Sequence, residues 1–209
     1  MKREMPVRQE YPCATSLATG SFSYSSAVAI ATGLIEILSP FCEILPNGIP
    51  AIAIVGSIRR RKPFVNDIDL VAIPKKENDD CRSGNPAQPN EMEHKLSALC
   101  LDELLTPELN GKKVKRFLVN EWSPRLKNRP IPLDMYVATR ASWWTQLLLR
   151  TGSRDYNIEL AVRAHHLRLE LRGDGSGLLS PGGDPIRVNS EIEIFNHLML
   201  PYKPPSERS

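Results

Sequence analysis

The stretch VGSIRRRKPFVNDIDLV, residues 55–71, combines residue types that could bind an anion and a metal ion. Asp67 and Asp69 alternate with apolar residues, and residues two apart in a strand point to the same side with a rise of roughly 6.6 Å. Two carboxylates held on one face repel each other, and a bound cation relieves that repulsion. A ligand set made only of oxygen atoms favours Mg²⁺ or Mn²⁺ over zinc.

A third acid, Asp134, lies in the apolar stretch PLDMYVA, residues 132–138. If this stretch is a strand that pairs beside the first, Asp134 comes within about 5 Å of the other acids. Three carboxylates can hold two metal ions about 3.5 to 4 Å apart, which clamp the attacking and leaving oxygens of a phosphoryl transfer.

The alternative is that the DID motif is an exposed strand whose acids pair with the preceding arginines. Gly56, Ser57 and Arg60 favour the metal site. A glycine lets the backbone approach an oxyanion, and amide N–H groups at the start of a helical turn bind it, while serine and arginine side chains add further donors. The motif therefore predicts a triphosphate bound beside a metal ion.

Hydrophobic periodicity predicts the elements that position these residues. Predicted strands cover residues 51–55, 67–73, 114–120 and 132–138, with a small β patch between 167 and 188. Predicted helices cover residues 25–38, 91–105, 142–150, 154–167 and 189–198, the last with Ser190 and Glu193 in a capping box. Strands flanked by helices in mixed order indicate an α+β fold with a mixed β-sheet.

The overall composition is that of an ordinary globular protein. The net charge of the 209 residues is only +3, so bulk charge does not indicate nucleic-acid binding. Cys13, Cys42, Cys81 and Cys100 have neither zinc-site nor disulfide spacing. The sequence has no signal peptide and no run of about 18 apolar residues, so we expect a soluble, cytoplasmic protein without a membrane partner.

Four motifs, in order and with matching spacing, resemble the family X DNA polymerases, the polymerase beta-like branch of the nucleotidyltransferase superfamily. They are GS-x-RR with D-x-D ten residues after Ser57, Asp134, TGSRDYN at 151–157, and EIEIFNHLMLPYKPPSER at the C-terminus. The resemblance covers residues 25–209. It implies an N-terminal arm (1–23), a nucleotidyltransferase palm (24–138) and a small α/β thumb subdomain (139–209).

The resemblance also implies roles for particular residues. Asp67 and Asp69 would bind two Mg²⁺ ions, for which Mn²⁺ could substitute, and Asp134 would bind the catalytic ion and help to activate a primer 3′-hydroxyl. Gly56, Ser57 and Arg60 would hold the β and γ phosphates, beside Asn66. The remaining expected substrate-binding residues are Thr151, Gly152 and Ser153, in a turn beside the sugar and base, and Asn157, at the minor-groove edge of the nucleotide.

The implied function is DNA-directed DNA synthesis, with a DNA primer–template and a deoxynucleoside triphosphate as partners of a monomeric enzyme that fills short gaps in repair. Two alternatives stay open: a template-independent, RNA or small-molecule nucleotidyltransferase, and an inactive protein that binds DNA ends.

The sequence departs from the family pattern at four places, one of which is the arginine expected near the start of the first palm helix, which has no match between residues 24 and 34. Asn66 stands in place of a glycine, Pro132 in place of an arginine that would give Asp134 a positive neighbour, and Leu149-Arg150 in place of an aromatic pair. The resemblance leads us to expect a minimal palm-plus-thumb form without the family's lyase and fingers lobes. We therefore expect DNA contacts from thumb and loop cations, with steep salt dependence: Arg154, Arg163, Arg168, Arg172 and residues 112–116.

Trp143 and Trp144 could stack on bases. At the start of an apolar helix, however, they are expected to fill the seam between palm and thumb.

Overall fold

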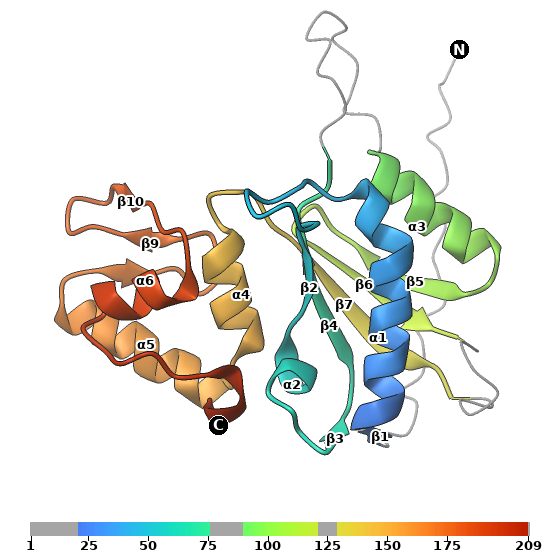
Figure 1. Cartoon of the computed structure of the whole chain (residues 1–209), viewed down its shortest axis with the longest axis horizontal. Helices are drawn as coiled ribbons and strands as arrows, with labels where there is room; N and C mark the ends of the chain where they lie inside the picture. The colour runs from blue at the N-terminus through green and yellow to red at the C-terminus, as the bar shows by residue number, and fades with distance from the viewer. Residues whose placement is uncertain (1–20, 76–89, 121–128, 209) are drawn as a thin grey trace, which may run out of the picture.

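A mixed five-stranded sheet forms the centre of the N-terminal part of the molecule (Figure 1). The computed structural model describes residues 21–75, 90–120 and 129–208, and most of the predicted arm lies outside them. The sheet order is β2-β4-β7-β6-β5, in which β4 and β7 are parallel and the other pairs are antiparallel. The strands are β2 (Ile52–Ile54), β4 (Ile68–Ala72), β5 (Leu105–Asn110), β6 (Val114–Val119) and β7 (Ile131–Val137).

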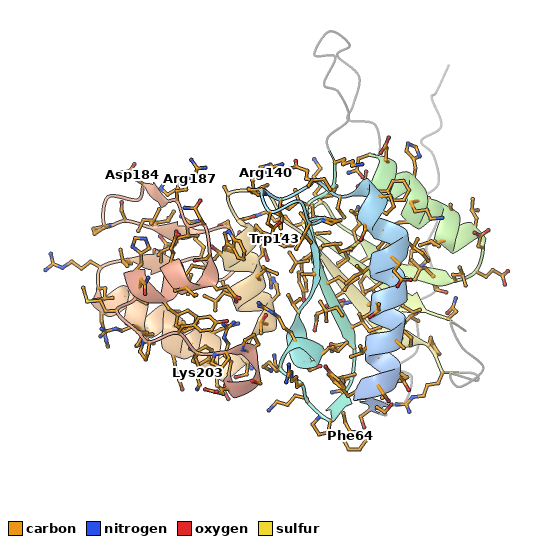
Figure 2. The ribbon with its side chains drawn as sticks, viewed as in Figure 1. Phe64, Arg140, Trp143, Asp184, Arg187 and Lys203 are labelled. Atoms are coloured by element: carbon orange, nitrogen blue, oxygen red, sulfur yellow. The ribbon has the colours of Figure 1, made fainter. Side chains whose placement is uncertain are left out.

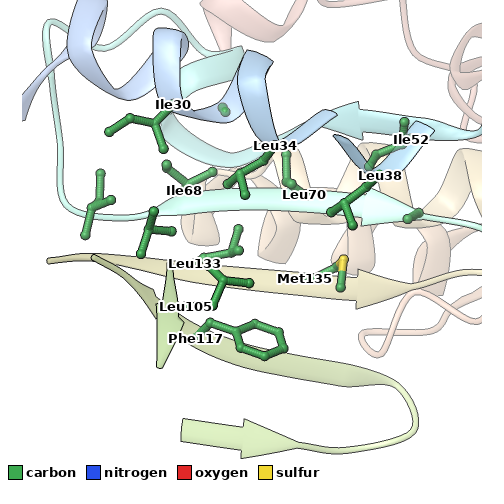
Figure 3. Packing of buried hydrophobic residues seen from close by; sticks show 14 of the residues in the cluster. Ile30, Leu34, Leu38, Ile52, Ile68, Leu70, Leu105, Phe117, Leu133 and Met135 are labelled. Carbon is green, nitrogen blue, oxygen red and sulfur yellow. The ribbon is translucent and has the colours of Figure 1, made fainter. Parts of the chain in front are cut away.

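Helices α1 (Tyr24–Leu38) and α3 (Glu91–Leu101) cover one face of this sheet (Figure 1). The hydroxyl of Ser23 caps α1 by accepting from the amide of Ser26 at 3.2 Å. Figure 3 shows the buried face of α1 against β4 and β7, which supply alternate side chains to the same core. The labelled residues of this core include Ile30, Leu34, Leu38, Ile68, Leu70, Leu133 and Met135.

The segment Tyr24–Phe41, which contains α1, is long and apolar enough by length and composition to cross a membrane, which corrects the expectation that the sequence has no such run. In the structure, however, Ala31, Leu34 and Leu38 are fully buried against the sheet. A core helix of a folded domain passes the same test of length and composition, so this segment is explained by its packing.

The opposite face of the sheet meets helix α4 (Trp143–Thr151). Trp143 and Leu147 from α4 pack against Val71 of β4, in a small apolar cluster of their own. Trp143 therefore lies at the seam between the sheet and the C-terminal part (Figure 2), and its ring meets that of Trp144 edge to face at 6.5 Å. The prediction that this aromatic pair fills the seam is confirmed.

The C-terminal part has a separate apolar core, which helices α4, α5 (Arg154–His166) and α6 (Glu191–His197) share with a small antiparallel sheet. The sheet order is β10-β9-β8. Its strands are β8 (Glu170–Leu171), β9 (Leu178–Leu179) and β10 (Pro185–Ile186). A third, two-stranded sheet pairs β1 (Phe22–Ser23) with β3 (Phe64–Val65). The two larger sheets and the helices that pack on them confirm the predicted α+β fold with a small α/β unit at its C-terminal end.

The structure corrects two local predictions. The helix predicted to reach residue 105 ends at Leu101, and β5 follows, although Pro107 and several exposed polar residues weaken its strand pattern. Pairing with β6 outweighs that local pattern. In α6 the Ser190 hydroxyl accepts from the Glu193 amide as predicted, but the Glu193 carboxylate bonds the amide of Asn189 instead of Ser190.

Candidate functional site

Two of the three predicted acids are direct neighbours on the sheet. Asp69 of β4 and Asp134 of β7 are register partners in the parallel pair. Their chain neighbours are buried in the core on the face that α1 covers, so both carboxylates lie on the other face. Asp67 lies just before β4 and two residues before Asp69, so the two side chains are expected on the same face of the sheet. The prediction that the strand of Asp134 pairs beside that of Asp69 is confirmed.

Asp67, Asp69 and Asp134 form a cluster of like charges that repel one another. Burial, together with the charges of Asp67 and Asp134, raises the pKa of Asp69 to about 7. Burial and the charge of Asp134 also raise the pKa of Asp67 above its ordinary value. A divalent cation would relieve this repulsion, and the donors are all oxygen atoms, so the residues present fit Mg²⁺ or Mn²⁺ chemically.

A formed three-ligand group is nevertheless absent from residues 21–75, 90–120 and 129–208: no three histidine, cysteine, aspartate or glutamate side chains among them are placed to hold a metal ion. The two carboxylate oxygens of Asp134 accept from Arg116 Nε at 2.6 Å and Nη2 at 2.9 Å. In this conformation an arginine supplies the positive charge at the third acid.

Arg116 also corrects the expectation that Asp134 lacks a positive neighbour because Pro132 replaces an arginine. Arg116 lies on β6 directly opposite Asp134. Its side chain is 48% exposed, whereas that of Asp134 is 13% exposed. The hydrogen bond to Asp134 and its charge raise the pKa of Arg116 above its ordinary value. The spacing of Arg116 and Asp134 along the chain does not predict this pair, because the pair depends on the register between β6 and β7.

Tyr136 is a site residue that the sequence analysis missed. Its hydroxyl lies 3.5 Å from Asp69 Oδ1 and 3.4 Å from Asp134 Oδ2, at the long limit of a hydrogen bond. The guanidinium of Arg150 lies over its ring at 4.3 Å. Alternation with Asp134 along the strand was the available signal, because residues two apart share a face.

We call the turn that the sequence predicts to bind an anion the anion cradle; it consists of Gly56, Ser57 and Arg60. The turn begins at helix α2 (Gly56–Arg59), a single helical turn just after β2. Gly56 has a φ of +62°, and a Cβ atom there would lie 1.9 Å from Asp69 Oδ2. Only glycine therefore lets this turn approach the carboxylate. The hydroxyl of Ser57 is buried without a hydrogen-bond partner among the described residues, as expected of a donor reserved for a ligand.

Arg60 lies between the cradle and the C-terminal part. Its guanidinium donates to the carbonyl oxygen of Thr151, and its Nε has no partner among the described residues. Burial lowers the pKa of Arg60, although the charges of Asp69 and Asp67 oppose that shift. Arg60 thus joins the two halves of the site and retains a free donor toward it.

The turn at residues 151–153 and the helix after it form the opposite wall. Gly152 has a φ of +59°, and the hydroxyl of Ser153 caps α5 by accepting from the amide of Tyr156 at 3.3 Å. Asn157 Nδ2 donates to the carbonyl of Leu149 at 2.7 Å, which leaves Asn157 Oδ1 buried and without a partner among the described residues.

These two walls enclose a cleft with a volume of about 610 Å³. The structure brings most predicted site residues together on its surface: Gly56, Ser57, Arg60, Asn66, Asp67, Asp69, Gly152, Ser153 and Asn157. Asp134 is not among the residues that line the cleft, although it is the register partner of Asp69. Thr151 is fully buried and its hydroxyl donates to Leu147, so Thr151 fixes Arg60 instead of lining the cleft.

A buried ion cluster ties the cradle to the C-terminal part. Arg59 of α2 donates to both carboxylate oxygens of Glu191, at 3.0 and 2.6 Å, and to the hydroxyl of Thr151 at 2.7 Å. Arg208, which is fully buried, donates to the same carboxylate at 2.8 Å. Hydrogen bonds and charges from both arginines outweigh burial and hold the pKa of Glu191 below its ordinary value. No pattern in the sequence predicted that Arg59 would join α2 to Glu191.

The structure combines a mixed sheet that carries paired acids beside a glycine-serine turn with a small α/β unit after it. Residues 146–209 match the family model described as DNA polymerase beta thumb. The C-terminal part is therefore similar to the thumb of DNA polymerase beta, which supports a family X polymerase-like form. The match includes Gly152, Asn157 and Glu191 and ends beyond Arg208, whereas the three acids and the cradle lie outside it.

Proposed function

We propose that the chain is a DNA-directed DNA polymerase of family X that adds deoxynucleotides to a primer 3′-hydroxyl in short-gap repair. The observation that carries the proposal is the pairing of Asp69 with Asp134 beside the Gly56 turn, at a cleft whose far wall is the thumb domain. One cleft thus holds an acid cluster and an anion cradle.

Each group has a distinct task in this proposal. The amides of the α2 turn, the Ser57 hydroxyl and Arg60 bind the β and γ phosphates of the triphosphate. Asp67, Asp69 and Asp134 would hold two Mg²⁺ ions, which when bound neutralise charge on the transferring phosphoryl group. Arg116 orients the Asp134 carboxylate, and each bonded carboxylate oxygen keeps a lone pair for a second partner.

The thumb would hold the nucleotide and the DNA. Asn157 and Arg154 both line the cleft, and Asn157 Oδ1 is buried without a partner among the described residues. Among the other predicted DNA contacts, Arg163 donates to the Leu198 carbonyl at 2.9 Å and Arg172 pairs with Glu170 at 3.0 Å. Arg154 and Arg168 are consequently the stronger candidates for phosphate contacts.

Primer extension tests the proposal. The wild-type chain with Mg²⁺ or Mn²⁺ is expected to extend a primer across a one-nucleotide gap, and Asp134→Ala is expected to abolish the product. Asp102→Ala, an exposed acid at the end of α3, is the matched control and is expected to extend normally. No product from wild type, or undiminished product from Asp134→Ala, would reject the proposal.

One observation favours a second acceptor or sugar class. Arg150, stacked on Tyr136, stands where the family resemblance expects an aromatic residue. Parallel reactions with ribonucleotides and with an unpaired single-stranded primer test a ribonucleotidyl or template-independent transferase. Tight DNA binding without metal-stimulated turnover in any arm would instead identify an inactive DNA-end-binding protein.

A further inference from the structure

A second cavity, with a volume of about 750 Å³, lies at the N-terminal end of α4. We call it the seam groove, because its walls come from the turn at residues 45–47, from Arg140–Trp144 and from the thumb hairpins. It shares no lining residue with the catalytic cleft, which lies at the other end of α4 near Gly152. Figure 2 places Arg140 and Trp143 at the seam and Arg187 on the neighbouring thumb hairpin.

One wall of the seam groove is an edge strand. Residues 185–189 line it consecutively, and β10 is the last strand of its sheet, paired only to β9 among the described strands. Ser180 donates to the Asp184 carbonyl at 2.8 Å, and Ile186 is the register partner of Leu178. Because hydrogen-bonded residues alternate in an antiparallel pair, the main-chain groups of Pro185 and Arg187 face away from β9.

Open main-chain groups at a sheet edge can pair with an extended peptide. Here the available groups are the carbonyl of Pro185 and both the N–H and the carbonyl of Arg187. Because proline has no N–H, Pro185 can only accept a hydrogen bond, whereas Arg187 can both donate and accept one. A peptide strand therefore fits this wall in a defined register.

The side chains of the seam groove define the chemistry of that peptide. Trp144 and Ile186 provide partly exposed apolar surface above the buried Trp143 and Leu178, and no aspartate or glutamate lines the groove. Arg140 is already bound to Glu43 at 2.6 Å. Arg187 is exposed and has no ion-pair partner among the described residues. The complementary ligand combines apolar side chains with one carboxylate.

We propose that the seam groove binds an extended segment of a partner protein, which adds to the free edge of β10. An apolar side chain of the segment packs between Trp144 and Ile186, and an acidic side chain pairs with Arg187. A nucleic acid fits less well, because one unpaired cation does not provide the row of phosphate contacts that nucleic-acid binding uses. The proposal does not depend on polymerase activity.

Selection from a displayed library of random peptides about twelve residues long tests the proposal on the full chain. Selected peptides are expected to alternate apolar residues with at least one aspartate or glutamate. Their fluorescein-labelled forms should bind wild type in an anisotropy titration, and Arg187→Glu should weaken binding by about tenfold or more. Arg172→Glu, the same charge change on the thumb outside the groove, is the matched control and should leave binding unchanged.

Amide chemical shifts then locate the bound peptide. Shifts concentrated at residues 143–144 and 185–189 support the proposal. It is overturned if no peptide is enriched, if Arg187→Glu leaves the affinity unchanged, or if the shifts fall in the catalytic cleft. A single-stranded oligonucleotide or a second copy of the chain that occupies the same residues in place of the peptide would also overturn it.

Discussion

Arg116 and Asp134 face each other across the β6–β7 pair, joined by two hydrogen bonds of 2.6 and 2.9 Å. The guanidinium holds both oxygens of the third acid, so it fixes the plane of the carboxylate before any substrate or metal ion arrives. A bidentate arginine adds geometric specificity to charge, which a lysine cannot reproduce.

We therefore expect Arg116→Gln to lower kcat for primer extension about tenfold, equivalent to about 1.4 kcal/mol, with little change in the KM for nucleotide. Arg116→Lys should recover only part of the loss, because it restores charge without the planar fork. Steady-state extension on a gapped primer measures both constants. A kcat for Arg116→Gln equal to that of wild type would show that Asp134 needs no such orientation.

Gly56 should tolerate no side chain. In Gly56→Ala the new Cβ would lie 1.9 Å from Asp69 Oδ2 at a φ of +62°, so either the turn or the acid must move. We expect triphosphate binding, measured by equilibrium titration, to weaken by about tenfold or more while the far-ultraviolet circular dichroism stays native.

Gly48→Ala is the matched control for Gly56→Ala. Gly48 also has a positive φ, +81°, but nothing lies within 4 Å of an added Cβ. This variant should lose only the roughly 1–2 kcal/mol of left-handed backbone strain and bind triphosphate normally. Equal losses of binding in both variants would contradict a specific role for the Gly56 turn.

The stack of Arg150 on Tyr136 depends on a thumb hairpin. Arg150 donates from Nε to Gln146 at 3.0 Å and from Nη2 to the Asp174 carbonyl at 2.9 Å. A Cβ at Gly175 would lie 2.5 Å from the Gln146 side chain, at a φ of +79°. Gly175→Ala should therefore displace Arg150 and change the ratio of kcat/KM for deoxynucleotides to that for ribonucleotides.

Gly183→Ala provides the comparison for Gly175→Ala. Gly183 has a φ of +85° and open space around an added Cβ, so its substitution strains the backbone without touching Arg150. The ratio of kcat/KM for deoxynucleotides to that for ribonucleotides should be the same in Gly183→Ala as in wild type. If Gly175→Ala also keeps the wild-type ratio, Arg150 does not influence sugar selection.

Glu191 should make the stability of the protein depend on acid pH. Its pKa is lowered in the folded state by Arg59 and Arg208, so the folded protein binds this proton less readily than the unfolded chain. The stabilising contribution is fully present above the unfolded pKa of about 4.3 and is lost as the pH falls through the folded value. The free energy of unfolding should therefore decline below about pH 4.5.

Glu191→Gln removes that charge and leaves the buried Arg208 and the partly buried Arg59 without a carboxylate partner. It should cost about 3–5 kcal/mol of unfolding free energy at pH 7, and its stability should decline less between pH 5 and pH 3 than that of wild type. Urea denaturation across this pH range gives both quantities. A variant as stable as wild type at pH 7, with the same acid decline, would exclude the ion cluster as a stabilising tie.

Local patterns in the chain were sufficient for the main elements and for most of the site. Alternation placed Asp67 and Asp69 on one side of a strand, and the glycine-serine turn indicated the anion cradle, because both depend on neighbours along the chain. The same alternation contained Tyr136, which went unnoticed. The helix predicted through residue 105 was wrong because pairing with β6 outweighs the local pattern of β5.

The remaining site contacts were decided by the tertiary structure. Arg116 and Asp134 are 18 residues apart, and Arg59 and Glu191 are 132 apart, so neither pair follows from spacing. The first depends on strand register and the second on the packing of the thumb against α2. A sequence encodes the periodicity of each element directly, whereas a contact between elements exists only after burial of the shared cores has fixed their relative positions.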